Sequence, residues 1–141
     1  MLMMDVNVLV YAHREEMPEH KRYAQWLRET AGGLEPFALS EFVVHGFVRV
    51  VTNGKIFDPA STTEEAFRFI DTLVEMPGCT MIRAGARHWG IFRGLCEGRK
   101  LKGKLVADAA HAALAIESGC EWVTGDSDFA RFAPPLRWRL L

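Results

Sequence analysis

Cysteine is scarce in this chain of 141 residues. Its three cysteines, Cys79, Cys96 and Cys120, are widely separated and form no Cys-x-x-Cys motif. An odd and scattered set of thiols argues against a disulfide framework and against a zinc site, and it fits a reducing compartment. We therefore expect a cytoplasmic protein in which the cysteines are small apolar side chains.

Long apolar runs and an excess of one charge are also absent. No hydrophobic stretch approaches the roughly 20 residues of a membrane-spanning helix. The apolar start is broken by Asp5 and Asn7 and has no basic leader, so we expect neither a signal peptide nor a membrane protein. The formal net charge is −1, which gives no bulk attraction to nucleic acid. Length and composition predict a single globular domain over residues 1–141.

Apolar runs and amphipathic segments alternate along the chain. Strands are expected at 1–4, 34–39, 79–82 and 122–124, with a fifth at 136–140. Helices are expected at about 8–12, 19–31, 41–51, 63–75, 85–97 and 104–118, with Ser40 and either Thr62 or Thr63 as N-caps. This alternation is typical of parallel βαβ units and predicts an α/β fold.

Five carboxylates follow the strand-like runs or begin the helices after them: Asp5, Glu41, Asp108, Asp126 and Asp128. Ligands of parallel α/β sheets bind beyond the carboxyl ends of the strands, so these acids are expected to meet at one edge. Carboxylates that lie close together repel one another unless a cation neutralises them, and hard cations such as Mg²⁺ or Mn²⁺ prefer oxygen ligands. The set predicts a metal-dependent enzyme of phosphoryl transfer.

Each acid also has a purely structural explanation. Asp5 can cap the helix after it, Glu41 can stabilise a first helical turn, and Asp126 or Asp128 can support a turn in a glycine-containing loop. Asp108 is harder to explain in this way, because it lies in an otherwise apolar helix, where a buried carboxylate needs a partner.

A short basic segment precedes Asp108 and comprises Arg99, Lys100, Lys102 and Lys104. Such a segment is either a solvated connector or a contact for a phosphate backbone, and the sequence leaves both open. His111 follows Asp108 on the same Ala-rich helix, where packing is the more common role for a histidine than acid–base chemistry.

The ordered set of motifs resembles those of PIN-domain nucleases, and more narrowly those of VapC, the toxin ribonucleases of type II toxin–antitoxin pairs. The motifs are Met4-Asp5-Val6-Asn7, Ser40-Glu41, Ala107-Asp108-Ala109 and Thr124-Gly125-Asp126-Ser127-Asp128-Phe129. The resemblance extends from Met3 to Trp138. One departure is Val6, where many members of the family have a threonine or serine hydroxyl.

This resemblance implies a PIN-like three-layer α/β/α sandwich with a central parallel sheet of about five strands. The catalytic acids it implies are Asp5, Glu41, Asp108, Asp126 and Asp128. The metal ligands would be Asp5, Asp108 and Asp126, with Asn7 and Thr124 orienting the carboxylates.

The implied activity is that of an Mg²⁺-dependent endoribonuclease, with Mn²⁺ as a substitute, in which one or two ions activate water and stabilise the leaving oxygen. The RNA backbone would contact Arg99, Lys100, Lys102 and Lys104. The implied partner is a small VapB-type antitoxin that places a basic side chain near the acids, in a hetero-oligomer or beside a homodimer. Apolar side chains of the segment 19–51 would form the groove for it, unless the core uses them all: Trp26, Leu27, Phe42, Val43 and Phe47.

Two alternatives remain. A haloacid-dehalogenase-like phosphatase needs Asp-x-Asp near the N-terminus, but the second position here is Asn7. A non-catalytic PIN-like module that binds RNA or a protein would have no reason to keep five mutually repelling carboxylates.

Overall fold

A five-stranded parallel sheet forms the centre of the computed structural model, which describes residues 1–141. The strand order is β3-β2-β1-β4-β5, and every neighbouring pair is parallel. The strands are β1 (Leu2–Met4), β2 (Phe37–Ser40), β3 (Cys79–Ile82), β4 (Glu121–Thr124) and β5 (Trp138–Leu140). Because β1 is central and covered on both faces, Met3 and Met4 are completely buried.

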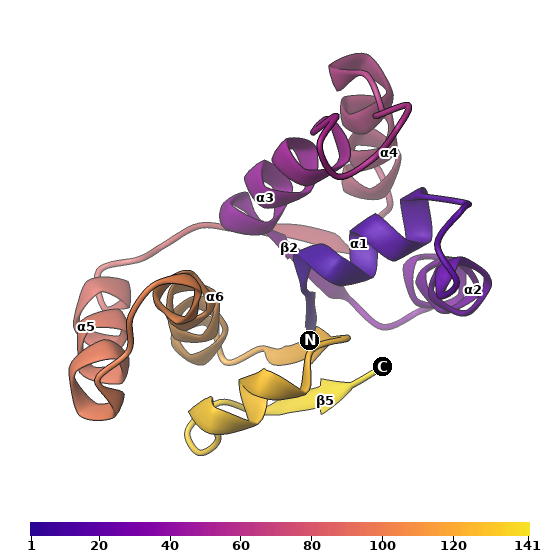
Figure 1. The fold of residues 1–141 in the computed structure, drawn as a ribbon. Helices are drawn as coiled ribbons and strands as arrows, with labels where there is room; N and C mark the ends of the chain where they lie inside the picture. The colour runs from indigo at the N-terminus through magenta and orange to yellow at the C-terminus, as the bar shows by residue number, and fades with distance from the viewer.

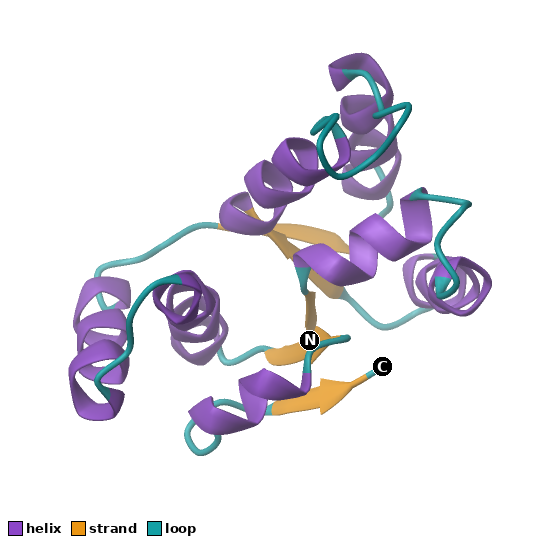
Figure 2. Cartoon of the chain, viewed as in Figure 1, coloured by secondary structure: helices purple, strands orange, loops and turns teal.

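Helices cover both faces of the sheet, as Figures 1 and 2 show. One group comprises α1 (Val6–His13), α2 (His20–Ala31), α3 (Glu41–Val51) and α4 (Thr63–Val74). The other comprises α5 (His88–Arg99), α6 (Lys104–Ser118) and the short 3₁₀ helix η1 (Ser127–Phe132). The chain runs from β1 outward to β3 and then returns to β4 and β5. Since crossovers between parallel strands are right-handed, this reversal places the two groups on opposite faces. The three-layer prediction is confirmed.

Local sequence signals explain most helix boundaries. The Ser40 hydroxyl accepts a hydrogen bond from the Val43 amide at 3.1 Å, and Thr62 forms a capping box with Glu65. Gly119 ends α6 in the left-handed region, at φ 67°. Helix α1 begins two residues earlier than expected, because the Asp5 carboxylate accepts from the Val6 amide and starts the helix there.

The structure differs from the sequence expectations in further places. Helix η1 was not predicted. Helix α5 begins three residues later than expected, at His88, and strand β2 begins at Phe37 rather than at residue 34. Helix α5 buries only Leu95, and its Trp89 is 67% exposed. Among the apolar side chains of the segment 19–51, Val43 and Phe47 are completely buried in the core, so they are not free to form a groove, whereas Leu27 is buried but lines a cavity between α2 and α4. No helix combines the length and apolar character that a membrane crossing would require.

Candidate functional site

Three aspartates from distant parts of the chain line one cavity of about 620 Å³. Asp5 follows β1, Asp126 follows β4, and Asp108 lies in the first half of α6. Strands β1 and β4 are neighbours in register, with Met4 opposite Val123, so their carboxyl ends bring Asp5 and Asp126 to the same edge. Of the five acids that were expected to meet, the structure brings Asp5, Asp108 and Asp126 to one cavity.

The Asp5 carboxylate is buried and held by three donors. Its Oδ1 accepts from the Val6 amide at 2.6 Å, and its Oδ2 accepts from Asn7 Nδ2 at 2.9 Å and from Thr124 Oγ1 at 2.5 Å. Asn7 and Thr124 therefore fix the position of Asp5, as expected from the sequence. Burial nevertheless raises the pKa of Asp5 to about 6, because the loss of solvation outweighs these hydrogen bonds, and the nearby Asp108 and Asp126 carboxylates add to the rise.

The loop after β4 is hydrogen-bonded to Asn7 and Thr124, the same two residues that hold Asp5. The Gly125 amide donates to Asn7 Oδ1 at 2.9 Å, and the Asp126 amide donates to Thr124 Oγ1 at 3.0 Å. A side chain at Gly125 has no room, because an added Cβ would lie 2.6 Å from the Tyr23 hydroxyl oxygen. The glycine thus permits the close approach that places Asp126 at the cavity.

Asp108 carries the clearest sign of a missing partner. Its Oδ2 is buried and has no hydrogen-bond donor. Burial raises the pKa of this carboxyl, Lys104 lowers it, and the Asp126 and Asp128 carboxylates raise it. Lys104 begins α6 and places its Nζ 3.3 Å from Asp126 Oδ2, so the ammonium offsets part of the negative charge. A buried acceptor without a donor is costly unless a proton or a cation reaches it.

Glu41 and Asp128 lie outside the residues that line this cavity. Glu41 begins α3, and its carboxylate turns toward the loop after β3, 3.5 Å from the Ala84 amide and 3.9 Å from Arg83 Nε. The side chain of Asp128 is 57% exposed and lies 3.7 Å from Arg131. Their catalytic roles stay predictions.

The four basic residues of the predicted RNA-binding segment have different environments. Arg99 donates to the Arg131 carbonyl at 2.8 Å and to the Pro134 carbonyl at 3.3 Å, so it fastens the loop after η1. Lys104 pairs with Asp126. Lys100 and Lys102 are exposed and form no ion pair.

His111 lines the cavity beside Asp108 and stacks on Trp122, with 5.5 Å between ring centroids. Burial lowers the pKa of His111 to about 4, so the imidazole is neutral near pH 7. This environment fits the expected packing role.

Sequence reasoning missed much of the cavity wall, including the polar residues Tyr11 and Arg49. Both lie on helices, α1 and α3, that the sequence did predict. The signal that could have found them is the helical face shared with Asn7 and Gly46, but its orientation toward the acids depends on how α1 and α3 cross.

The donor chemistry of the site fits a hard divalent cation. No group of three or more His, Cys, Asp or Glu side chains is arranged to ligate one ion. Mg²⁺ does not need such a cage, because it keeps several waters and typically binds one or two carboxylates together with substrate phosphates. The unpartnered Asp108 oxygen beside Asp5 and Asp126 offers that kind of set.

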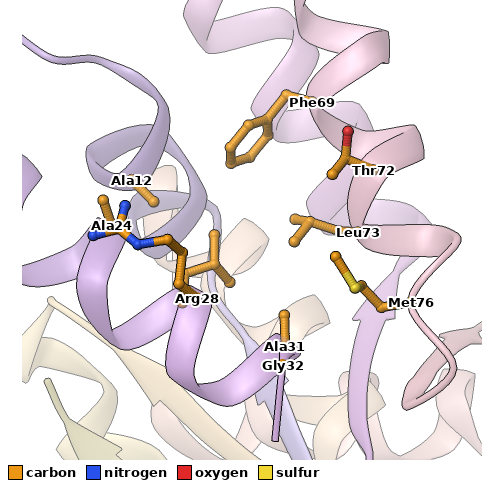
Figure 3. A pocket seen from close by; sticks show the side chains of 10 residues that line it. Ala12, Ala24, Arg28, Ala31, Gly32, Phe69, Thr72, Leu73 and Met76 are labelled. Carbon is orange, nitrogen blue, oxygen red and sulfur yellow. The ribbon is translucent and has the colours of Figure 1, made fainter.

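A second, smaller cavity of about 270 Å³ lies between α2 and α4 (Figure 3). Leu27 and Ala31 line it from α2, and Phe69 and Leu73 face them from α4. Its only charged lining residue is Arg28, so this cavity is an apolar binding pocket rather than a catalytic centre.

Comparison with known proteins agrees with this geometry. The family model described as PIN domain matches residues 2–134. Ribonuclease VapC43 of Mycobacterium tuberculosis is 42% identical over 139 residues, which cover 99% of this chain and 94% of that protein. The chain belongs to the PIN-domain family, among the VapC ribonucleases. Ribonuclease VapC31 of the same organism is 36% identical over 142 residues, covering 96% of this chain and 100% of the relative.

A solved structure has the same fold. The crystal structure of VapBC2 from Rickettsia felis, bound to a DNA fragment from its promoter, superposes with a TM-score of 0.72 at 21% identity and covers 99% of this chain and 97% of that one. Membership in the PIN-domain family sets aside the haloacid-dehalogenase-like alternative. PIN-domain ribonucleases generally depend on a divalent metal ion.

Proposed function

We propose that residues 1–141 form one PIN domain that acts in the cytoplasm as an Mg²⁺-dependent endoribonuclease, the toxin of a toxin–antitoxin pair. The observation that carries the proposal is the convergence of Asp5, Asp108 and Asp126 on one cavity, with one Asp108 oxygen buried and unpartnered. The relatives' activity as ribonucleases makes RNA the substrate.

The residues of the site have separable tasks in this reaction. Asp5, Asp108 and Asp126 would hold the cation, which when bound lowers the pKa of water and neutralises charge on the phosphoryl and leaving oxygens. Asn7 and Thr124 keep Asp5 in one orientation. Lys104 lines the cavity and can donate to a phosphoryl oxygen when RNA and the cation take over its contact with Asp126.

Glu41 and Asp128 have secondary tasks in the proposal. Glu41 is about one-third exposed and is held only by long contacts to Ala84 and Arg83, so it is free to turn toward bound RNA or water. Asp128 supports the loop of Asp126, because its amide donates to Asp126 Oδ1 at 2.9 Å. Asp128→Asn should therefore be milder than Asp126→Asn.

Cleavage of single-stranded RNA by the purified chain tests the activity. EDTA should abolish cleavage, and Mg²⁺ or Mn²⁺ should restore it. Asp5→Ala and Asp108→Ala should each lose cleavage while keeping a cooperative unfolding transition. The matched control is Asp71→Asn, which removes one exposed carboxylate from α4. RNA binding without cleavage at any metal concentration would instead favour the non-catalytic module, and wild-type rates in Asp108→Ala would refute the site.

An antitoxin of the VapB type is the proposed partner. The solved relative from Rickettsia felis is a complex of this kind. The acidic cavity can accept a guanidinium, which binds carboxylates bidentately and competes with the metal. The apolar cavity between α2 and α4, which Ala24, Leu27 and Ala31 of the segment 19–51 line in part, is the proposed binding site for apolar antitoxin side chains. We expect this chain in a hetero-oligomer with its antitoxin, or in a homodimer.

Co-expression with the neighbouring small reading frame tests the partner. The wild-type toxin should be toxic alone, harmless with the antitoxin, and recovered as a complex. Met76→Arg places a charge in the apolar cavity and should weaken the complex, whereas Val74→Arg, on the exposed side of α4, should not. Equal complex formation by both variants would remove this cavity from the interface.

A further inference from the structure

The cavity that holds the three aspartates extends well beyond them. It continues between α1, α3 and the α3–α4 loop, along a part that we call the apolar arm. The lining residues that define the arm are Val10, Tyr11, Met17, Arg49, Val50 and Ile56. One continuous space is thus lined both by the aspartates and by the residues of the arm, and Tyr11 joins the two parts, because its ring lies 3.5 Å from where a Cβ of Gly125 would be.

The chemistry of the arm differs from that of the acidic end. No carboxylate lines it, and its single charge is Arg49, which forms no ion pair and no side-chain hydrogen bond. Tyr11 is half-buried, and its hydroxyl has no hydrogen-bond partner. Burial raises the pKa of Tyr11, and the carboxylates of Glu19, Asp126 and Asp5 raise it further, so this hydroxyl stays protonated and can donate. Ile56, at 53% exposure, is one of the most exposed large apolar side chains of the chain.

The wall formed by the α3–α4 loop is fixed in place. Arg14, at the end of α1, donates to Ser61 Oγ at 2.9 Å and to the Pro59 carbonyl at 2.8 Å. Its guanidinium carbon lies 4.4 Å from the centre of the Phe57 ring, and His13 contacts Ser61 Oγ at 2.9 Å. The loop that carries Ile56 is therefore fastened to α1, and the arm is formed before any ligand binds.

We propose that the apolar arm is a nucleobase subsite, which takes the unpaired base of a nucleotide adjacent to the scissile phosphate. The base would lie against Tyr11 and Ile56, and Arg49 would contact the next phosphate of the strand. This inference rests on the proposed ribonuclease function and deepens it, since it assigns the residues that would bind a base of the RNA next to the cleaved bond.

Three features favour an unpaired nucleotide as the occupant. Aromatic and apolar side chains beside an unpaired cation are what single-stranded nucleic acid requires, because a base stacks on a ring and its phosphate needs a positive charge. The arm is continuous with the acidic end, where the cleaved phosphate would be. A base within a duplex is stacked and paired, so it cannot enter a cavity of this kind.

RNA binding without cleavage gives the first readout. The Asp108→Asn protein would be titrated with a labelled single-stranded octaribonucleotide and with the same sequence as a duplex, and the dissociation constants compared. We expect tighter binding of the single strand. Tyr11→Leu, Ile56→Ser and Arg49→Gln should each weaken it by about tenfold. Tyr11→Phe keeps the ring and should bind nearly as the parent does.

Matched controls separate the arm from general surface effects. Phe67→Ser removes an apolar side chain of similar exposure, 50%, from α4, and Arg68→Gln removes one exposed charge from the same helix. Neither should change RNA binding. Thermal unfolding of every variant would show that the fold is kept.

A substrate with a missing base gives the second readout. In an oligonucleotide that the wild type cleaves at one bond, an abasic residue next to that bond should lower kcat/KM for the wild type and change it little for Tyr11→Leu.

Wild-type binding and cleavage by the three arm variants would refute the subsite while leaving the ribonuclease assignment intact. Arm-dependent RNA binding by a protein that never cleaves would refute the ribonuclease and keep the subsite. Arm variants that lose only the antitoxin would assign the arm to a protein and overturn the proposal.

Discussion

Asp5 combines structural and functional demands in one side chain. It caps α1, accepts three hydrogen bonds, and still has its pKa raised to about 6, since burial and two neighbouring carboxylates outweigh the donors. The predicted capping role and the predicted metal role are therefore compatible: the cap fixes the carboxylate, and the remaining cost of burying its charge is what a cation would relieve.

Asp5→Asn should stabilise the metal-free protein at neutral pH. The folded state holds the proton up to a pH of about 6, whereas the unfolded carboxyl loses it near 3.8. The free energy of unfolding of the wild type should therefore fall as pH rises through this window, by up to about 3 kcal/mol. The Asp5→Asn variant should not show this fall in the free energy of unfolding. Urea unfolding at several pH values with EDTA measures it, and a wild-type stability that rises across the window would contradict the prediction.

Gly125→Ala should damage the site through one close approach. The new methyl group would meet the Tyr23 hydroxyl at 2.6 Å and displace the loop of Asp126. A displacement of this size should lower cleavage by about 10- to 100-fold. Adding Tyr23→Phe removes the clashing oxygen and should restore part of the rate, measured against Tyr23→Phe alone. Gly54→Ala, where an added Cβ meets nothing within 4 Å, serves as the control.

At the scale of elements, local chemistry explains the best predictions. Strand β3 and helix α6 match the predicted ranges because Gly78 and Gly119 bound them and their apolar patterns are unambiguous. Helix η1 was missed, since its start depends on the Asp126 side chain accepting from the Asp128 amide, and the same residues also fit an irregular loop. Which apolar side chains of the segment 19–51 are free for a partner could not be predicted, because periodicity cannot distinguish Val43 and Phe47 in the core from side chains at an interface.

The capping box of α4 gives a prediction at this scale. Thr62→Ala removes the acceptor of the Glu65 amide and should destabilise the protein by about 1 kcal/mol. Thr63→Ala, one residue later, removes a hydroxyl that caps nothing and should have a smaller effect. The urea unfolding midpoints of the two variants would test this difference. Equal destabilisation by both would show that the Thr62 cap does not stabilise α4.

At the scale of the whole molecule, the acidic site is a product of topology. The sequence predicted that five acids would meet at one edge of the sheet, and three of them, Asp5, Asp108 and Asp126, line one cavity. Asp5 and Asp126 meet because they follow the neighbouring parallel strands β1 and β4, whereas Asp108 reaches the cavity from α6. The direction in which each side chain points could not be predicted from the sequence. Glu41 also follows a strand, β2, which lies between β1 and β3. The Glu41 carboxylate turns toward Arg83 on the β3 side, away from Asp5 on the β1 side. The cavity arm was missed for the same reason, since it depends on the crossing of α1 and α3.

The charge distribution around the cavity divides the basic segment into parts with different tasks. Arg99 holds the loop after η1, and Lys104 is paired with Asp126. Lys100 and Lys102 are exposed and come shortly before Lys104, which lines the cavity, so they are free to meet the RNA backbone. Because the chain as a whole has a net charge of −1, attraction of RNA must come from such local groups rather than from the total charge.

Lys100→Ala combined with Lys102→Ala should weaken RNA binding in the Asp108→Asn protein without changing the cleavage sequence in the active one. The slope of log K against log salt should become shallower by about 0.7 for each phosphate of the single strand that the variant no longer neutralises. Lys21→Ala with Arg22→Ala removes the same charge from α2 and should leave the slope unchanged. Arg99→Ala should instead lower the unfolding midpoint, since it frees the Arg131 and Pro134 carbonyls. An unchanged slope in the Lys100 and Lys102 variant would return this segment to the role of a solvated connector.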